Sequence, residues 1–371
     1  MNVKKRLNNQ KWLFVAVLSI CIIAILIWIY LPRHISSDPV RQISLPSSAA
    51  ERLGQNFVVG IPDTNLDTNT IAFLKHIQPA GIVLYARNYS SLDQITNLIA
   101  SLQKIAKETT GKPYFIMIDE EPGGATRLNL FQNVFATGQP NWPQINHDVG
   151  TMRNIGINVD FAPVLDFPFD NNSFIDFRMP ANTTSALISF DTQFIDLLHQ
   201  DGIAATLKHF PGMGIFEVDP HQALPQSTID NDILAQSLDI FQKGINDGAD
   251  FVMTAHAVYD NVDPNNPATL SSKIIEGLLR ERLSFKGLVI TDDLSDMPFI
   301  LDKKMDLTQA TIDAIRNGQN LVLFSHKNEA TQKIFDSIIL SMKDDKELDS
   351  VVSDNYSKIV SFKDLFLGGS R

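Results

Sequence analysis

The stretch Leu278–Ser295, LLRERLSFKGLVITDDLS, carries an amphipathic pattern into a buried apolar run that ends on two acids, Asp292 and Asp293. A continuous apolar run is typical of a parallel strand that is covered on both faces. Side chains alternate along a strand, so the two acids are expected on opposite sides of it. The stretch therefore predicts a helix–strand unit of an α/β protein that presents one carboxylate at the carboxyl end of its strand.

Seven more apolar runs of this kind occur between residues 51 and 340. They are 56–62, 81–87, 114–121, 157–167, 203–210, 250–259 and 320–326. Segments with helical spacing and enough length for crossovers lie between them, such as 91–109, 185–201, 231–247, 271–283 and 307–317. Eight such units favour a closed (β/α)8 barrel of the TIM type over an open doubly wound sheet. The pattern of residues 345–366 predicts a helix that closes the domain. No G-x-G-x-x-G or Walker pattern, the signatures of nucleotide-binding loops, follows a predicted strand.

The composition is that of a globular protein, with 44% hydrophobic and 20% charged residues, which excludes disordered classes. The chain has 31 Lys and Arg residues and 42 Asp and Glu residues, and four of the cations lie within residues 1–12. Beyond that tail, 27 basic residues against 42 acidic ones leave a net charge of −15. A body this acidic is a poor nucleic-acid binder, because phosphate binding requires a basic footprint.

The N-terminal region predicts a membrane anchor. Residues 13–31 are uncharged and apolar over nineteen positions, about the length that crosses a bilayer. By the positive-inside rule, the basic tail 1–12 would be cytoplasmic, and a catalytic domain over 51–371 would lie on the periplasmic or extracellular side, after a linker over 32–50. The single cysteine, Cys21, lies in the apolar segment, which excludes an intramolecular disulfide and a cysteine metal site.

Polar side chains gather where the predicted strands end, which is where such barrels carry their active sites. The strongest local signal is Lys208–His221, KHFPGMGIFEVDPH. Asp219 and His221 are two apart, and Pro220 biases Asp219 toward an extended backbone, so both side chains can point the same way. An Asp that holds a His in one tautomer gives a general acid/base, although an isolated Asp-x-His is more often a solvated loop.

These stretches resemble the family 3 glycoside hydrolases, and within them the single-domain bacterial β-N-acetylhexosaminidases. Leu278–Ser295 follows that family's active-site pattern of two aliphatics, a basic residue, a Gly, three aliphatics and Ser/Thr-Asp. Lys208–His221 is similar to the family's KHFPGHG followed by Asp-Ser-His at the same spacing. The segment IDEEPGGATRL resembles its Asp-Gln-Glu-Gly-Gly-Arg-Val-Gln-Arg. The resemblance covers roughly residues 50–340.

The resemblance implies a role for each matching residue. Asp292 corresponds to the catalytic nucleophile, His221 to the acid/base and Asp219 to its partner. The positions that correspond to substrate-binding residues are Asp119, Arg127, Arg178, Lys208 and His209. These roles describe a retaining double displacement, in which Asp292 forms a covalent glycosyl-enzyme while His221 protonates the leaving oxygen and then activates water.

The implied substrate is a glycan with a terminal N-acetylglucosamine, derived from the cell wall as a muropeptide or from a chitin-type chain. The resemblance implies no metal and no cofactor. The natural aglycone and the oligomeric state stay open. Five positions depart from the family pattern, and none of them has an implied catalytic role. They are Glu120, Pro122, Gly124, Met213 and Pro220.

Four alternatives stay open beside this interpretation. A Schiff-base lyase could use Lys208 on the same barrel, and a metal hydrolase could use His209, His256 and Asp292. A substrate-assisted hexosaminidase is a closer alternative, because its carboxylates act without a covalent link to the sugar. The departures at Met213 and Pro220 also suggest a catalytically degenerate, membrane-tethered barrel that only binds glycan.

Overall fold

The computed structural model describes most of the chain from residue 48 to residue 368. The described residues are 48–136, 138–167, 169, 173–175, 178, 180, 181, 183–295, 306–326 and 328–368. Within the chain, Leu45–Arg371 forms one compact unit. The predicted basic tail 1–12, the predicted anchor 13–31 and the linker up to residue 47 lie outside the described residues.

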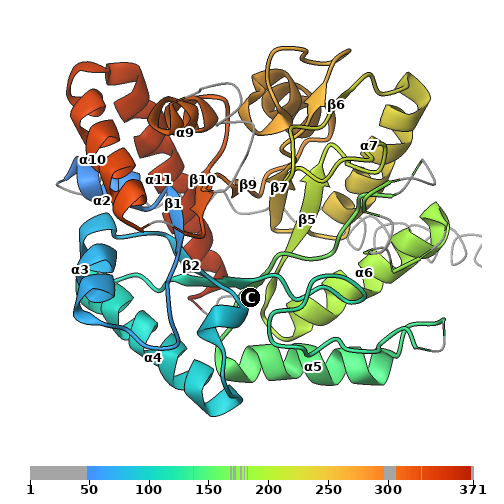
Figure 1. The fold of residues 1–371 in the computed structure, drawn as a ribbon, viewed down its shortest axis with the longest axis horizontal. Helices are drawn as coiled ribbons and strands as arrows, with labels where there is room; N and C mark the ends of the chain where they lie inside the picture. The colour runs from blue at the N-terminus through green and yellow to red at the C-terminus, as the bar shows by residue number, and fades with distance from the viewer. Residues whose placement is uncertain are drawn as a thin grey trace, which may run out of the picture. The chain divides into compact units, whose positions relative to one another are not determined.

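Eight parallel strands close into a barrel, as the sequence predicts (Figure 1). The order around the barrel is β1-β10-β9-β7-β5-β4-β3-β2. The strands are β1 (Phe57–Gly60), β2 (Gly81–Leu84), β3 (Phe115–Ile118), β4 (Val159–Asp160), β5 (Ala204–Phe210), β7 (Phe251–Thr254), β9 (Leu288–Asp293) and β10 (Leu321–Phe324). Two short strands, β6 (Gln226–Ser227) and β8 (Val258–Tyr259), pair outside the barrel. Alternating strands and helices with this closure are the arrangement of a (β/α)8 TIM barrel.

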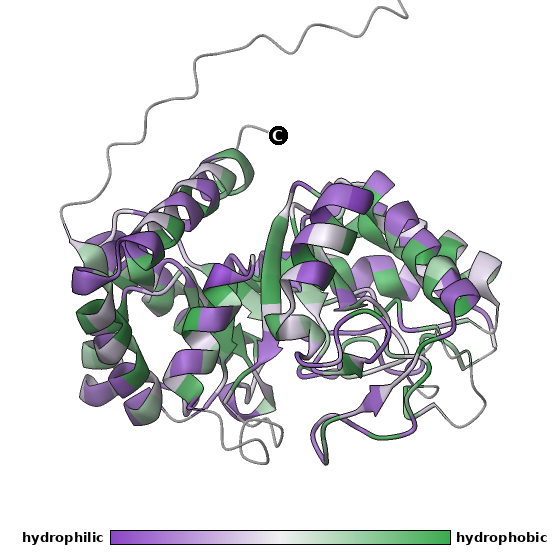
Figure 2. Cartoon of the chain, turned by 90° about the horizontal axis from the view of Figure 1, so that it is seen from above, coloured by the Kyte–Doolittle hydropathy of each residue, from purple (hydrophilic) through white to green (hydrophobic). Residues whose placement is uncertain are grey.

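Helices follow the barrel strands and surround them. They are α3 (Thr68–Ile77), α4 (Leu92–Thr109), α5 (Trp142–Ile155), α6 (Thr184–Gln200), α7 (Asn231–Asn246), the π-helix η4 (Lys273–Arg282), α9 (Leu307–Arg316) and α10 (Asn328–Asp344). Short helices α2 (Ala49–Gly54), η1 (Ala86–Asn88) and η3 (Ala268–Leu270) lie in connections. Most α-helices begin at a side-chain cap, as α4 does at Ser91, whose hydroxyl accepts the N–H of Gln94. Figure 2 shows purple and green bands along the helices, as expected for amphipathic elements.

The barrel interior is filled by every second side chain of the strands. Phe115 and Met117 of β3 and Leu288 and Ile290 of β9 belong to one buried apolar cluster. The same alternation brings the next residue of each strand, two positions further on, to the inside of the barrel at its carboxyl end. The strands therefore carry an apolar interior that changes to polar side chains at the mouth.

The amino-terminal end of the barrel is closed by the helix α11 (Lys346–Phe366), which confirms the predicted closing helix. Its Phe362 and Phe366 pack against the interior cluster, and Phe362 lies 5.9 Å from Phe115 and 5.3 Å from Phe251 between ring centroids. The barrel is therefore sealed at this end, and its polar mouth lies at the other.

The predicted membrane localisation needs correction. Among the described parts of residues 48–368, no helix is long and apolar enough to cross a membrane. The 21 residues of α11 would suffice in length, but charged side chains such as Asp354 and Lys358 recur along it. The segment 13–31, on which the prediction rested, lies outside the described residues. The structure therefore contradicts the predicted membrane-anchored localisation.

Candidate active site

A buried ion-pair network lies at the mouth of the barrel, around Lys208 at the end of β5. The Lys208 ammonium donates to Asp119 Oδ1 at 2.7 Å and contacts Glu121 Oε1 at 2.6 Å. Arg127 donates to the other oxygen of Asp119 at 3.0 Å, and Arg178 makes a bidentate pair with Glu121. Three cations therefore hold two carboxylates in fixed orientations.

The charges of this network keep its members ionised. Burial opposes ionisation of Asp119, but Lys208 and Arg127 outweigh it and hold the pKa of this carboxyl well below its usual range. Burial is likewise outweighed by Lys208 and Arg178 at Glu121, whose pKa falls to about 2. Burial alone would lower the pKa of Lys208, yet the two carboxylates raise it. The network is thus a set of permanent charges at neutral pH.

Glu120 shapes the loop that carries Asp119 and Arg127. Its carboxylate accepts backbone N–H groups from Arg127 at 2.7 Å, Leu128 at 2.9 Å and Leu130 at 2.9 Å, and it also accepts the Thr126 hydroxyl. An ionised carboxylate can only accept hydrogen bonds, and these four donors satisfy both oxygens of Glu120. Glu120 therefore fixes the loop that positions Arg127 over Asp119.

Asp292 and Asp293, at the end of β9, point to opposite sides of the strand and lie in different environments. Asp292 is two residues after the inward-facing Ile290, and its side chain is 17% exposed at the mouth. Burial raises the pKa of Asp292, but the surrounding histidines, His209 foremost, outweigh burial and lower it. Asp293 is buried and accepts the N–H and hydroxyl groups of Ser295 and Ser325. Asp292 is therefore the ionised carboxylate that faces the mouth.

His209 connects Asp292 to a second, deeper carboxylate. Its Nδ1 lies 2.5 Å from Asp166 Oδ2, and Asp166 Oδ1 also accepts the backbone N–H groups of His209 at 3.0 Å and Met213 at 2.8 Å. With Nδ1 bound to Asp166, the other ring nitrogen, Nε2, faces Asp292 Oδ2 at 3.8 Å. His209 is therefore an oriented, buried neighbour of Asp292.

The pair of Asp219 and His221 forms as the sequence predicts. Asp219 Oδ1 lies 2.7 Å from His221 Nδ1 and also accepts the backbone N–H of His221 at 2.9 Å. The His221 side chain is 62% exposed, in the loop between β5 and α7. Burial lowers the pKa of His221, but the charges of Asp292 and Asp219 outweigh burial and raise it. His221 is therefore an exposed imidazole that is electrostatically coupled to Asp292.

The structure thus groups the predicted residues in two sets. One set is the ion-pair network of Asp119, Arg127, Arg178 and Lys208, and the other consists of Asp292, His209, His221 and Asp219. Sequence reasoning assigned no role to Glu121, Asp166 or Tyr85. Strand alternation is the signal for Glu121, which follows Asp119 by two residues, and for Tyr85, which follows the inward Val83 by two.

The geometry weighs against two of the alternatives. A Schiff-base lyase needs a neutral amine, whereas Lys208 is paired with two carboxylates and its pKa is raised. A metal hydrolase would need His209, His256 and Asp292 to converge. Across the described ranges, no group of three His, Cys, Asp or Glu side chains is arranged to hold a metal. The ring nitrogens of His256 contact Thr269 Oγ1 at 2.7 Å and the Asp293 carbonyl at 3.2 Å.

Comparisons with known proteins show the family of the chain. The model of the glycosyl hydrolase family 3 N-terminal domain matches residues 48–361. The chain belongs to glycosyl hydrolase family 3. It is 34% identical over 253 residues to a beta-hexosaminidase of Xanthomonas campestris pv. campestris, covering 64% of this chain and 75% of that protein. The family and these homologues make the protein a glycoside hydrolase.

Two solved structures share the fold. A beta-N-acetylglucosaminidase from Paenibacillus sp. FPU-7 is 28% identical with a TM-score of 0.75, over 86% of this chain and 63% of that one. This chain therefore spans less than two thirds of the Paenibacillus chain. A Beta-N-acetylhexosaminidase from Beutenbergia cavernae is 25% identical with a TM-score of 0.77, over 86% of this chain and 99% of that one.

For two of the departures from the family pattern, Gly124 and Met213, the structure shows why the residue fits its position. A side chain at Gly124 would begin 2.1 Å from Glu121 Oε2, so Gly124 leaves the room in which Glu121 binds Arg178. Met213 is 1% exposed and packs in the apolar core, while its backbone N–H binds Asp166. Both substitutions therefore fit the observed side-chain arrangement.

Proposed function

We propose that the protein is a retaining exo-β-N-acetylhexosaminidase, with Asp292 as nucleophile and His221 as acid/base. The observation that carries the proposal is an ionised carboxylate at the barrel mouth that is coupled to an exposed Asp–His pair. The Xanthomonas, Paenibacillus and Beutenbergia proteins, whose names give hexosaminidase or N-acetylglucosaminidase activity, support the same reaction.

In the first step, Asp292 attacks the anomeric carbon of the terminal sugar and the glycosidic bond breaks. His221, whose pKa is raised, transfers its proton to the leaving oxygen, so the aglycone departs as a neutral alcohol. Asp219 holds His221 through Nδ1 and stabilises its charge before the transfer. His209, which is oriented by Asp166, lies beside Asp292 and favours the ionised form of its carboxylate.

In the second step, the now neutral His221 removes a proton from water, and the resulting oxygen nucleophile attacks the anomeric carbon of the glycosyl-enzyme. The bond to Asp292 breaks, and the sugar leaves with its original anomeric configuration. His221 is protonated again and Asp292 is again a carboxylate. The cycle therefore needs only water besides the glycoside.

We assign recognition of the terminal sugar to the ion-pair network. Asp119 would accept hydrogen bonds from sugar hydroxyls, while Arg127 and Arg178 would donate to hydroxyl or acetamido oxygens. Their carboxylate partners already hold both guanidinium groups. Because Lys208 is 1% exposed, we assign it to fixing the two carboxylates rather than to direct contact with the sugar.

We assign the substrate to glycans that carry a terminal β-linked N-acetylglucosamine, of either muropeptide or chitin type. The purified full-length protein is expected to release 4-nitrophenol from 4-nitrophenyl N-acetyl-β-D-glucosaminide. Asp292→Ala should abolish this, whereas Asp293→Asn tests whether the neighbouring carboxylate has only a structural role. Sugar binding without turnover in the wild type would contradict the proposal and favour the degenerate glycan-binding barrel.

A further inference from the structure

Asp166, in the connection after β4, is a buried carboxylate whose two oxygens bind different groups. Its Oδ1 accepts the backbone N–H groups of His209 at 3.0 Å and Met213 at 2.8 Å. Its Oδ2 lies 2.5 Å from Nδ1 of the His209 ring. The charge of Asp166 also acts on Arg178 and Tyr259. Because the two backbone bonds fix the carboxylate, its second oxygen fixes the position of the ring.

The connection that carries Asp166 is itself held to the segment that carries His209. The Leu165 N–H donates to the Lys208 carbonyl at 2.7 Å. The Phe169 N–H donates to the Gly214 carbonyl at 3.1 Å. These bonds lie on both sides of Asp166 along the chain. The carboxylate therefore has a fixed backbone on which to hold the imidazole.

The His209 ring lies between two carboxylates. Its Nε2 is 3.8 Å from Asp292 Oδ2, while Nδ1 contacts Asp166. One nitrogen of a neutral imidazole donates and the other accepts, whereas both donate when the ring carries a second proton. With the first proton held at Nδ1 by Asp166, a second proton lies at Nε2, toward Asp292. The cationic ring then pairs with a carboxylate at each nitrogen.

Other groups also favour the ionised form of Asp292. His256 after β7 and His221 in the loop after β5 lower the pKa of Asp292, and the Asp293 N–H donates to its Oδ1 at 2.8 Å. Burial opposes all of them, and His209 has the largest effect among the histidines. Burial also lowers the pKa of His256 itself, which disfavours its charged form. His209 is therefore the main cationic neighbour of the nucleophile.

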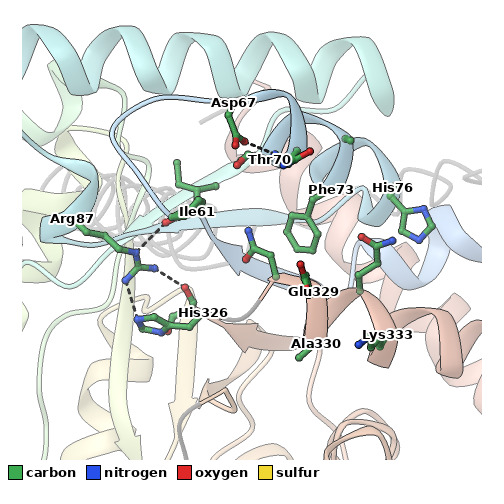
Figure 3. Close-up of a pocket in the computed structure, with 16 residues that line it drawn as sticks. Ile61, Asp67, Thr70, Phe73, His76, Arg87, His326, Glu329, Ala330 and Lys333 are labelled. Atoms are coloured by element: carbon green, nitrogen blue, oxygen red, sulfur yellow. Dashed lines mark hydrogen bonds between the residues drawn. The ribbon is translucent and has the colours of Figure 1, made fainter.

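The charged groups on the β10 side lie against Asp293. His326 Nδ1 is 3.7 Å from Asp293 Oδ2. Arg87 donates to the Ile61 carbonyl at 3.0 Å and to the Ser325 carbonyl at 2.5 Å, and it contacts His326 Nε2 at 3.1 Å (Figure 3). The side chain that supports the charge of Asp292 therefore comes from β5 rather than from β10.

We propose that Asp166 is a positioning residue for the nucleophile, because it holds His209 with one ring nitrogen toward itself and the other toward Asp292. The inference rests on the proposed function and names the residue that sets the ionisation of its nucleophile. Loss of the Asp166 charge has two opposite effects on Asp292. Removing a negative charge makes Asp292 easier to ionise, but removing the partner of the cationic ring makes it harder. We expect the second effect to be larger, because His209 lies between the two carboxylates.

Asp166→Asn exchanges one atom of this arrangement. Its Oδ1 still has to accept the N–H groups of His209 and Met213, so the new NH2 group replaces Oδ2 and donates to His209 Nδ1. The ring can then no longer hold a proton at Nδ1. We expect the acidic limb of kcat/KM on the 4-nitrophenyl glycoside to move up by about one pH unit, because an opposite charge this close lowers a carboxyl pKa by about that amount or more. A limb that stays in place or moves to lower pH would overturn the proposal.

The matched control is Asp160→Asn. Asp160 is buried at the end of β4 and accepts the Glu120 N–H at 3.0 Å through Oδ1, so the same exchange is made at a carboxylate that binds the loop after β3. The acidic limb should stay in place. His209→Gln, with a neutral side chain, should move the limb up as Asp166→Asn does. The double variant should move it no further than His209→Gln alone, whereas additive shifts would show that Asp166 does not act through the ring.

A measurement on the ring itself does not depend on turnover. The chain has eight histidines, and 15N NMR of the histidine-labelled full-length protein identifies the His209 signals by their loss in His209→Gln. The neutral ring is expected to carry its proton at Nδ1 in the wild type and at Nε2 in Asp166→Asn. A proton at Nε2 in the wild type would overturn the proposal, even if Asp166→Asn does not fold. Failure of the wild type to hydrolyse the 4-nitrophenyl glycoside would instead overturn the proposed function, while the spectra still decide on Asp166.

Discussion

At the scale of single residues, Asp292 and Asp293 show how one step along a strand separates two roles. The alternation in β9 turns Asp292 to the mouth, while Asp293 binds Ser295 and Ser325 in a buried position. The alternation of side chains along a strand is enough to predict this opposite orientation from the sequence. It cannot predict the contact with Ser325, because that residue directly follows β10 and meets Asp293 only when the barrel closes.

The coupled charges of Asp219, His221 and Asp292 predict the pH dependence of activity. Asp292 must be ionised, and its lowered pKa places the acidic limb of kcat/KM below about pH 4. His221 must be protonated, and its raised pKa places the alkaline limb above about pH 6.5. Asp219→Asn removes a negative charge that favours the imidazolium, so the alkaline limb should move to lower pH.

The control for this prediction is Glu217→Gln. Glu217 is exposed in the same loop, two residues from Asp219, and its substitution removes the same charge without touching His221 through a hydrogen bond. The pH profile of kcat/KM on the 4-nitrophenyl glycoside is measured for both variants. An alkaline limb that stays in place in Asp219→Asn, or that moves equally in Glu217→Gln, would mean that Asp219 does not act on His221.

At the scale of elements, the loop after β3 shows where prediction from sequence ends. Its resemblance to the family motif located Asp119 and Arg127, and both lie in the network. Glu121 received no role because its partners, Lys208 and Arg178, lie far along the chain in β5 and in the β4–α6 connection. Their approach depends on barrel closure and on a loop path that no local pattern encodes.

This loop gives a prediction about Gly124. The Cβ of Gly124→Ala would lie 2.1 Å from Glu121 Oε2, so the carboxylate must turn away and lose its bonds to Arg178 and to the Ala125 N–H. We expect kcat/KM to fall about tenfold or more, since misplacing a positioning group by about 1 Å can cost up to a hundredfold. Steady-state kinetics on the 4-nitrophenyl glycoside measure the effect.

The matched control is Gly150→Ala. Gly150 lies in α5 with open space where its Cβ would be, so this substitution should leave the kinetics unchanged and raise the free energy of unfolding by about 0.5–1 kcal/mol. Normal kinetics in Gly124→Ala would show that the orientation of Glu121 does not matter for activity.

At the scale of the whole molecule, barrel closure at the end opposite the active site depends on α11. Lys363 of this helix is 1% exposed, donates to Gln55 Oε1 at 2.9 Å and lies 4.9 Å from the centre of the Phe115 ring. Burial lowers the pKa of its ammonium group to about 7. The ammonium group therefore loses its proton more readily in the folded barrel than in the unfolded chain.

The consequence is a pH-dependent free energy of unfolding. Between about pH 7 and pH 10.5, the unfolded chain binds more protons at Lys363 than the folded one, so stability rises with pH across this window and stays level below it. Lys363→Met should remove this slope and stabilise the protein at neutral pH. Denaturant unfolding at several pH values measures both effects. Lys358→Met, an exposed substitution on α11, should leave the slope unchanged, and a persistent slope in Lys363→Met would contradict the assignment.

The barrel could largely be predicted from the sequence, but the localisation of the protein could not. Continuous apolar runs gave all eight strands because each strand of a parallel barrel is buried on both faces. The run 157–167 yields only the two-residue β4, since Pro163 has no N–H to extend a ladder. The apolar pattern of 13–31 led to a membrane localisation that the structure contradicts, because hydropathy alone does not establish where a protein resides.

The most direct test of the account is covalent trapping on Asp292. A 2-deoxy-2-fluoroglucosyl fluoride carries a leaving group that needs no acid, and its glycosyl-enzyme is hydrolysed slowly. Incubation with the full-length protein, followed by peptic digestion and tandem mass spectrometry, should find one sugar on the peptide with Asp292, in the wild type and in His221→Ala alike. An absent adduct, or an adduct on another residue, would contradict the proposed nucleophile, and an absent adduct from an active enzyme would favour the substrate-assisted mechanism.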